Sequence, residues 1–140
     1  MANDCILKNY QIEKKIPPFI IAEMSGNHNQ SLERALAIVD EAAKAGAHAI
    51  KLQTYTADTM TIDCDNKDFR ITNPDSLWAG RTLYELYQEA HTPWEWHTEI
   101  YKRARERGLI PMSTPFDETS VDFLESLGNQ IYKISSLENN

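Results

Sequence analysis

Apolar residues recur at helical spacing in three segments of the chain, and each segment ends at a glycine. The segments are residues 31–46, 92–108 and 117–128. Side chains three and four positions apart share one face of a helix, so each segment predicts a helix with one buried stripe. The closing glycines suit the left-handed conformation that commonly ends a helix.

Residues suited to capping stand at the start of each segment. Ser31 and Asp117 can each accept hydrogen bonds from backbone N–H groups of a first helical turn. Thr92 and Glu95 have the spacing of a capping box, with Pro93 at the first helical position. These positions are where we expect the three helices to begin.

Short runs rich in apolar residues precede the first helix and follow each closing glycine. They are "PFIIAE" (18–23), "AHAIKLQ" (47–53), "LIPMS" (109–113) and "QIYKIS" (130–135). Alternation of strands and helices indicates right-handed crossovers and a parallel sheet, and therefore an α/β fold. Residues 1–16 alternate weakly around a polar centre and predict a small hairpin outside this repeat.

One connection is much longer than the others. Residues 54–91 separate the second predicted strand from the next helix, whereas such connections usually have ~2–6 residues. Within it, "TLYELYQEA" (82–90) has helical spacing. Long connections in α/β domains commonly cover the site at the strand ends, so we predict a functional insertion. A tolerated surface insertion is the alternative.

Composition narrows the class of protein. The net charge is −7 with no basic stripe, so we expect no nucleic-acid partner. Cys5 and Cys64 are far apart in sequence, which favours free thiols in a reducing cytosol. No apolar run approaches the ~18 residues of a membrane span. We therefore predict a cytoplasmic globular protein without a membrane partner.

Polar or charged side chains occur where each predicted strand ends, although a buried parallel strand should be apolar. They are Glu23, Lys51, Gln53, Ser113, Thr114, Lys133, Ser135 and Ser136. The carboxyl ends of parallel strands are where α/β proteins build their sites. Lys51 and Lys133 facing one space would repel unless an anion lay between them. The sequence thus predicts a pocket for a phosphate or carboxylate, with hydroxyl donors beside it.

Two acidic residues leave the interpretation open. Glu23 and Glu138 could neutralise the lysines within the protein, or they could transfer protons or bind substrate hydroxyls. His28 is expected to organise its loop by hydrogen bonding. No histidine pair has metal-ligand spacing, so no metal site can be assembled from these residues.

Four motifs, in this order, resemble the sialic acid synthase family. They are "FIIAEMSGNHNQS" (19–31), "GAHAIKLQTY" (46–55), "STPFDETSVDFLESL" (113–127) and "YKISSLEN" (132–139). The resemblance extends from about residue 18 to the last residue. Within the family, "LWAGRTLYELYQEAHTPWEWH" (77–97) is similar to the pseudaminic acid synthase branch.

The resemblance implies a (β/α)8 barrel of TIM type that condenses phosphoenolpyruvate with an N-acetylated amino sugar. In the pseudaminic acid branch the acceptor is a diacetamido-trideoxy-altrose; N-acetylneuraminate or legionaminate synthase activity is the alternative. The family also implies a divalent metal, Mn²⁺ or Mg²⁺, that polarises the sugar aldehyde. The full-length enzyme is expected to be a homodimer.

The resemblance also implies roles for individual residues. Lys51 and Lys133 match the family lysines that bind phosphoenolpyruvate, and Thr114 and Ser136 match residues that assist them. Gln53 matches a residue near the acceptor sugar. The two acidic positions named above, Glu23 and Glu138, match acidic groups of the active site with a catalytic or sugar-binding role.

Length is the main departure from the family pattern. A (β/α)8 barrel typically needs ~250 residues, and only about the first four strand–helix units are recognisable, in residues 17–140. The family's metal-binding histidines and its C-terminal antifreeze-like domain have no match in this sequence. We therefore expect an N-terminal half that is inactive alone, with its metal ligands outside this chain. A non-catalytic half-barrel that binds anions or a partner is the alternative.

Overall fold

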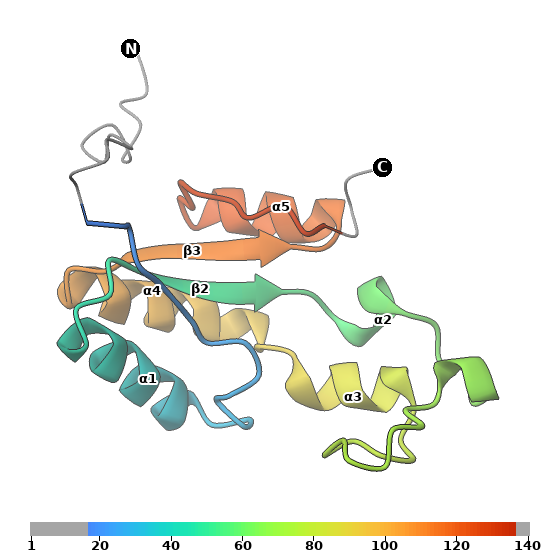
Figure 1. The fold of residues 1–140 in the computed structure, drawn as a ribbon. Coiled ribbons are helices and arrows are strands. Elements are labelled where there is room, and N and C mark those ends of the chain that lie inside the picture. Colours follow the sequence, from blue (N-terminus) through green and yellow to red (C-terminus); the bar gives the residue numbers. More distant parts are fainter. Residues whose placement is uncertain (1–16, 137–140) are drawn as a thin grey trace.

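The computed structural model describes residues 17–136 of the 140-residue chain. Three parallel strands form a sheet in chain order: β1 (Ile21–Glu23), β2 (Ala49–Thr54) and β3 (Ile110–Pro115). The main helices are α1 (Leu32–Lys44), α4 (His97–Glu106) and α5 (Glu118–Ser126). Helix α1 connects β1 to β2, α4 precedes β3 and α5 follows it (Figure 1). The predicted α/β fold with a parallel sheet is confirmed, whereas the predicted hairpin 1–16 lies outside the described residues.

The fourth predicted strand is reduced to a single parallel bridge. Tyr132 pairs with Ser113, and the backbone N–H of Lys133 donates to the carbonyl of Ser113 at 3.1 Å. Within residues 17–136 this segment pairs only with β3, so just one side of it is held by hydrogen bonds.

The helices cover one face of the sheet. Helices α1 and α4 lie side by side along it (Figure 1). Alternate residues of β2, Ile50 and Leu52, are fully buried in one cluster with Val39 of α1, Ile100 of α4 and Leu124 of α5. Each such side chain contributes about 1.5–3 kcal/mol by leaving water. The intervening residues of β2 therefore lie on the opposite face, away from the helices.

Two of the predicted helix starts are confirmed. The Ser31 side chain accepts a hydrogen bond from the backbone N–H of Arg34 and begins α1. The Asp117 carboxylate accepts from the backbone N–H groups of Thr119 and Ser120 and begins α5.

The capping box predicted at Thr92 is wrong. Residues 94–96 form a 3-10 turn, η3 (Trp94–Trp96), and α4 begins only at His97, without a side-chain cap. The hydroxyl of Thr92 lies instead 3.2 Å from His28 Nε2, 64 residues earlier in the chain. A tertiary hydrogen bond thus replaces the local one that the spacing predicted.

The predicted insertion folds into short helices beyond the carboxyl end of β2. They are α2 (Ala57–Met60), η2 (Lys67–Phe69) and α3 (Leu83–Ala90). Helices α2 and α3 pack together, and the hydroxyl of Tyr84 donates to Asp58 at 2.8 Å. Figure 1 shows this segment extending away from the strand ends. No helix within residues 17–136 is both long and apolar enough to cross a bilayer.

Candidate functional site

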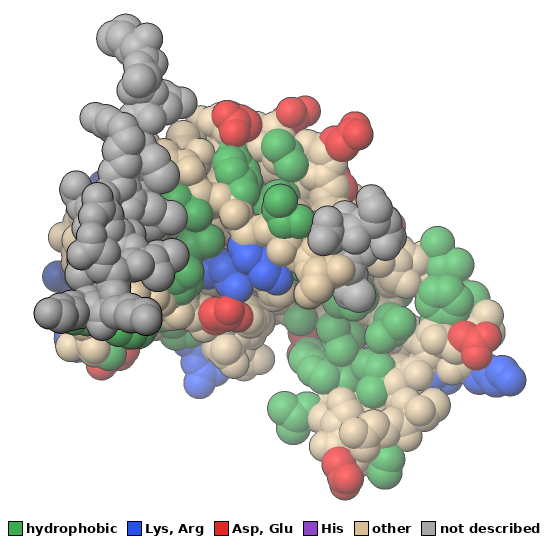
Figure 2. All heavy atoms as spheres, turned by 45° about the horizontal axis from the view of Figure 1, so that its top comes forward, with side chains coloured by type: hydrophobic (Ala, Val, Ile, Leu, Met, Phe, Trp, Pro, Cys, Tyr) green, Lys and Arg blue, Asp and Glu red, His purple; other side chains and the backbone are tan. Residues whose placement is uncertain are grey.

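The sheet face opposite the helices carries most of the predicted site residues. The strand register pairs Glu23 with Lys51, and Gln53 with Thr114. Lys51 and Gln53 are two positions apart on β2, so they share a face with these partners. Figure 2 shows Lys or Arg side chains gathered beside an acidic side chain in the middle of one face of the molecule.

Lys51 is largely buried and ion-paired. Its Nζ lies 2.6 Å from Glu23 Oε1, and the two side chains are 12% and 59% exposed. One of the alternatives that the sequence left open is therefore realised here, because Glu23 neutralises Lys51 within the protein. The glutamate is the exposed member of the pair, so it can move into solvent without opening the core.

Lys133 lies on the same face of the sheet as Lys51. The hydroxyl of the preceding Tyr132 donates to Glu125 of α5 at 2.6 Å, so Tyr132 is directed to the helical side. Successive side chains of an extended segment point to opposite faces, which directs Lys133 away from the helices. Lys133 is exposed, and within residues 17–136 no carboxylate lies within ion-pair distance of it.

The remaining predicted residues differ in their surroundings. Thr114 is buried and Gln53 is half-buried on the same face. Ser136 is exposed in a turn, and the described residues include no hydrogen bond between it and the others. Glu138 lies outside the described residues. The structure thus brings together Glu23, Lys51, Gln53 and Thr114, with Lys133 on the adjoining segment.

Sequence reasoning missed a buried network behind this face. His97 Nδ1 lies 3.2 Å from the carbonyl of Pro93, which only accepts, so Nδ1 carries the proton. Nε2 therefore accepts from the hydroxyl of Thr54 at 2.9 Å, and that oxygen accepts from Ser113 at 2.7 Å. Burial lowers the pKa of His97 to about 4. A neutral imidazole thus joins the ends of β2 and β3 to the start of α4.

His28 organises its loop, as predicted, and does so in the other tautomer. Its Nδ1 accepts from the backbone N–H of Gln30 at 3.2 Å, so Nε2 donates to Thr92. The ring is fully buried and makes a T-shaped contact with the ring of Trp96. Burial, and to a smaller extent the charge of His91, lowers the pKa of His28.

An aromatic cluster that the sequence did not reveal lies just beyond the strand ends. The ring centroid of Tyr55 lies 5.5 Å from that of Phe116 and 5.7 Å from that of Tyr87 of α3. Tyr55 follows Gln53 by two positions, and Phe116 follows Thr114 by two. Burial raises the pKa of Tyr55 to about 12, so its hydroxyl is protonated at neutral pH.

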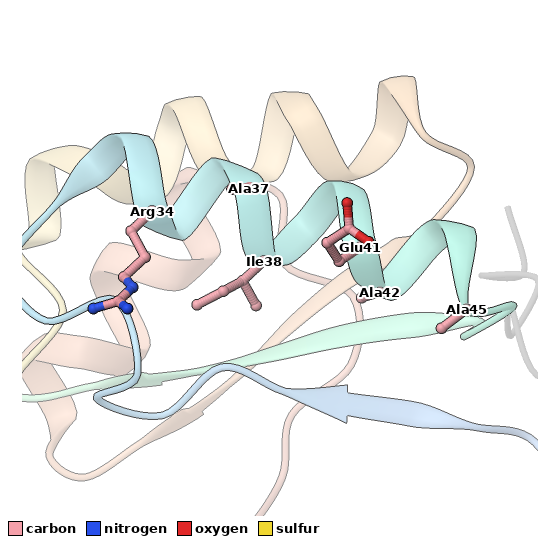
Figure 3. Close-up of a pocket in the computed structure, with 6 residues that line it drawn as sticks. All are labelled: Arg34, Ala37, Ile38, Glu41, Ala42 and Ala45. Carbon is pink, nitrogen blue, oxygen red and sulfur yellow. The ribbon is translucent and has the colours of Figure 1, made fainter.

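Metal ligation finds no support in the part of the chain that the structure covers. Among residues 17–136 no three His, Cys, Asp or Glu side chains are grouped so that they could hold an ion. A surface hollow of about 480 Å³ does occur on α1, away from the site (Figure 3). It is lined by Arg34, Ala37, Ile38, Glu41, Ala42 and Ala45. Its apolar lining from a single helix lacks the convergent polar groups of a ligand site.

Parallel strands with helical crossovers, and charged side chains at the strand ends, define an α/β protein of TIM-barrel type. The match to a family model over residues 38–140 shows that the chain belongs to the NeuB family. The predicted membership of the sialic acid synthases is thereby confirmed.

Three relatives illustrate the similarity. The chain is 48% identical over 132 residues to pseudaminic acid synthase of Campylobacter jejuni, covering 94% of this chain and 37% of that protein. It is 40% identical to N,N'-diacetyllegionaminic acid synthase of Legionella pneumophila, with 86% of this chain and 33% of that protein covered. The crystal structure of N-acetylneuraminic acid synthetase from Leptospira borgpetersenii superposes with a TM-score of 0.70 at 30% identity, covering 88% of this chain and 38% of that one.

The chain therefore spans between about a third and two fifths of the length of these relatives. Nearly all of its residues align, so the matched portion is a continuous part of the family fold.

Proposed function

We propose that this chain forms the phosphoenolpyruvate-binding part of a nonulosonate synthase, most like pseudaminic acid synthase. The observation that carries this proposal is the placement of Lys51, a lysine only 12% exposed on the sheet face away from the helices. Glu23 neutralises Lys51 in the unliganded protein, but Lys133 adds a second positive charge on the same face, so the two lysines together retain a net attraction for an anion. Phosphoenolpyruvate offers both a phosphate and a carboxylate to such a pair.

The proposed reaction joins two substrates and releases phosphate. C3 of phosphoenolpyruvate attacks the aldehyde carbon of an N-acetylated amino sugar, forming a C–C bond, and the aldehyde oxygen takes up a proton. Water adds to C2 of the former enol, and the C–O bond to phosphate breaks. The products are a nonulosonic acid and inorganic phosphate.

Each residue of the site has a role in this scheme. Lys51 and Lys133 neutralise the phosphate and carboxylate, and Thr114 donates a hydrogen bond from the neighbouring strand. Gln53 lies two positions closer to the strand end, on the side where the acceptor approaches. Glu23 leaves Lys51 when the anion arrives and is then available for proton transfer or for a sugar hydroxyl. Ser136 and Glu138 complete the proposed set.

The family's divalent metal, Mn²⁺ or Mg²⁺, would polarise the acceptor aldehyde. The side chains of residues 17–136 do not form a group that fits such an ion. The ligands of this metal stay a prediction for residues outside this chain.

Pseudaminic acid synthases support the choice of branch. Three of them are 44–48% identical to this chain, compared with 40% and 30% for two legionaminic acid synthases. The amino-sugar acceptor, a homodimer and a cytoplasmic location belong to the same proposal.

Calorimetric titration with phosphoenolpyruvate tests the proposal. We expect the wild-type chain to bind, and Lys51→Met to bind at least about tenfold more weakly, because a charge-assisted contact contributes on the order of 1.5–3 kcal/mol. Lys102→Met is the matched control, since Lys102 is 75% exposed on α4. Equal affinity for the wild type and Lys51→Met would contradict the proposal. Binding without turnover is expected both of this part of a synthase and of the non-catalytic half-barrel, whereas turnover would mean that a second copy or chain supplies the rest of the site.

A further inference from the structure

The C-terminus of α3 is closed by a side chain from a distant loop. Gln30 Nε2 donates to the carbonyl of Glu89 at 2.6 Å and to that of His91 at 2.9 Å. The last carbonyls of a helix have no partner within the helix, so a donor from outside stabilises that end. Gln30 is about sixty residues away in sequence, so this contact joins the insertion to the loop after β1.

Backbone conformation and hydrogen bonds hold the loop that carries Gln30 in place. Gln30 has a φ of 56° and Asn29 one of 47°, in the left-handed region that costs a non-glycine residue about 1–2 kcal/mol. The buried His28 holds the turn by accepting from the Gln30 N–H and donating to Thr92. Gly26 lets the helix approach, because a Cβ at this position would lie 3.2 Å from the carbonyl oxygen of Ala90.

The position of α3 determines one side of the aromatic cluster. Tyr87 lies on α3 and packs against Tyr55, which in turn contacts Phe116. Tyr55 is 4% exposed, whereas Tyr87 and Phe116 are only half-buried and keep accessible ring surface. Tyr55 and Phe116 come two positions after Gln53 and Thr114, so the cluster lies just beyond the carboxyl ends of β2 and β3.

We propose that Gln30 is a positioning residue for the acceptor: it fixes α3 so that Tyr87 and Phe116 offer ring surface to the acetamido methyl groups of an N-acetylated sugar. This inference rests on the proposed function. Ring surface beside polar strand ends suits a ligand that combines methyl groups with hydroxyls. A sugar bound there would lie next to the anion held by Lys51.

Hydrogen exchange measures the contact itself, whether or not the chain binds substrate. Gln30→Met removes the donor at nearly constant length, and we expect exchange of the α3 amides to rise about tenfold or more relative to those of β2 and β3. Gln30→Lys restores a donor that also suits a helix C-terminus, and should return the wild-type rate. Gln130→Met, at an exposed position after α5, should have no effect. An unchanged α3 rate in Gln30→Met would overturn the proposal.

Saturation-transfer NMR then tests the positioning role, with N-acetylmannosamine as the probe and phosphoenolpyruvate present. Saturating the aromatic protons should transfer signal to the acetamido methyl in the wild type, Gln30→Lys and Gln130→Met. Gln30→Met should lose at least half of that signal while its affinity for phosphoenolpyruvate is unchanged.

Faster α3 exchange with full methyl signal would show a structural role only, and overturn the proposal. Absence of methyl signal in a wild type that binds phosphoenolpyruvate would also overturn it. If the wild type does not bind phosphoenolpyruvate, both the proposed function and this inference about the acceptor are rejected. The contact between Gln30 and α3 would then still be tested by the hydrogen-exchange measurement alone.

Discussion

Glu23 and Lys51 occupy directly paired positions on neighbouring strands, and their ion pair has two consequences. The pair allows a lysine to be mostly buried, because the carboxylate 2.6 Å away balances its charge. It also means that an incoming anion must compete with Glu23 for the same ammonium.

Replacing Glu23 tests this competition. In Glu23→Gln the ammonium has no anionic partner on β1, so we expect phosphoenolpyruvate and inorganic phosphate to bind several-fold more tightly than in the wild type. The unliganded variant should also have a lower melting temperature, because a buried charge has lost its partner. Glu33→Gln, an exposed acidic position on α1, is the matched control. Titration calorimetry measures the affinity, and equal or weaker binding in Glu23→Gln would contradict the competition.

The chemistry of single residues was partly visible before the fold was known. Lys51 and Lys133 could be selected because charged residues are unusual within strand-like runs. Tyr55, His97 and Gln30 could not be selected, because their surroundings depend on residues that are distant in sequence. A tyrosine or histidine in isolation is equally consistent with a core position, a loop or a surface.

At the scale of elements, the helices form where local signals and the buried stripe agree. Helix α5 is an example, since its N-cap is sequence-local and its Leu124 is fully buried. Burial alone would raise the pKa of Asp117, but the hydrogen bonds from Thr119 and Ser120 outweigh it and lower the pKa. The folded state therefore favours the ionised carboxylate.

Removing the cap should destabilise the protein measurably. We expect Asp117→Ala to lower the free energy of unfolding by about 1 kcal/mol at neutral pH, with Asp117→Asn largely retaining it. Because the folded-state pKa is lowered, this contribution is present above the ordinary aspartate pKa and is lost as pH falls below it. Urea unfolding at pH 7 and in acid measures both effects. Equal stability of Asp117→Ala and the wild type at pH 7 would contradict the assignment.

The start of α4 shows where local signals fail. Thr92, Pro93 and Glu95 match a capping box, yet Thr92 bonds to His28 and the helix begins at His97. The Thr92 hydroxyl could accept from a nearby backbone N–H or form a hydrogen bond with His28. The second contact forms because the end of the insertion packs against the loop after β1.

At the scale of the whole molecule, two neutral buried histidines hold the two ends of the insertion. His97 forms a hydrogen bond with Thr54 at the end of β2, and His28 forms one with Thr92, between the insertion and α4. Both rings are fully buried, and burial lowers the pKa of each. The stability of the fold is therefore linked to pH through groups that no local motif identifies.

Acid should weaken the fold in a predictable direction. The unfolded chain binds a proton at His97 near pH 6.5, whereas the folded chain does so only near 4. The contribution of His97 to the free energy of unfolding is therefore fully present above the unfolded pKa and is lost as the pH falls from 6.5 towards 4. From pH 7 to pH 5 this loss is about 2 kcal/mol. Denaturant unfolding at both pH values should show a shallower pH dependence in His97→Gln than in the wild type. An identical pH dependence would contradict the assignment of His97 as buried and neutral.

The sequence by itself determined the α/β class, the places of α1 and α5, and the family. These follow from spacing, capping residues and ordered motifs, which are properties of adjacent residues. Only the tertiary structure decided that Glu23 neutralises Lys51, that Gln30 closes α3 and that two histidines of opposite tautomer hold the insertion. Each of these contacts joins residues 28 to 64 positions apart, and their geometry exists only once the strands have paired and the helices have packed.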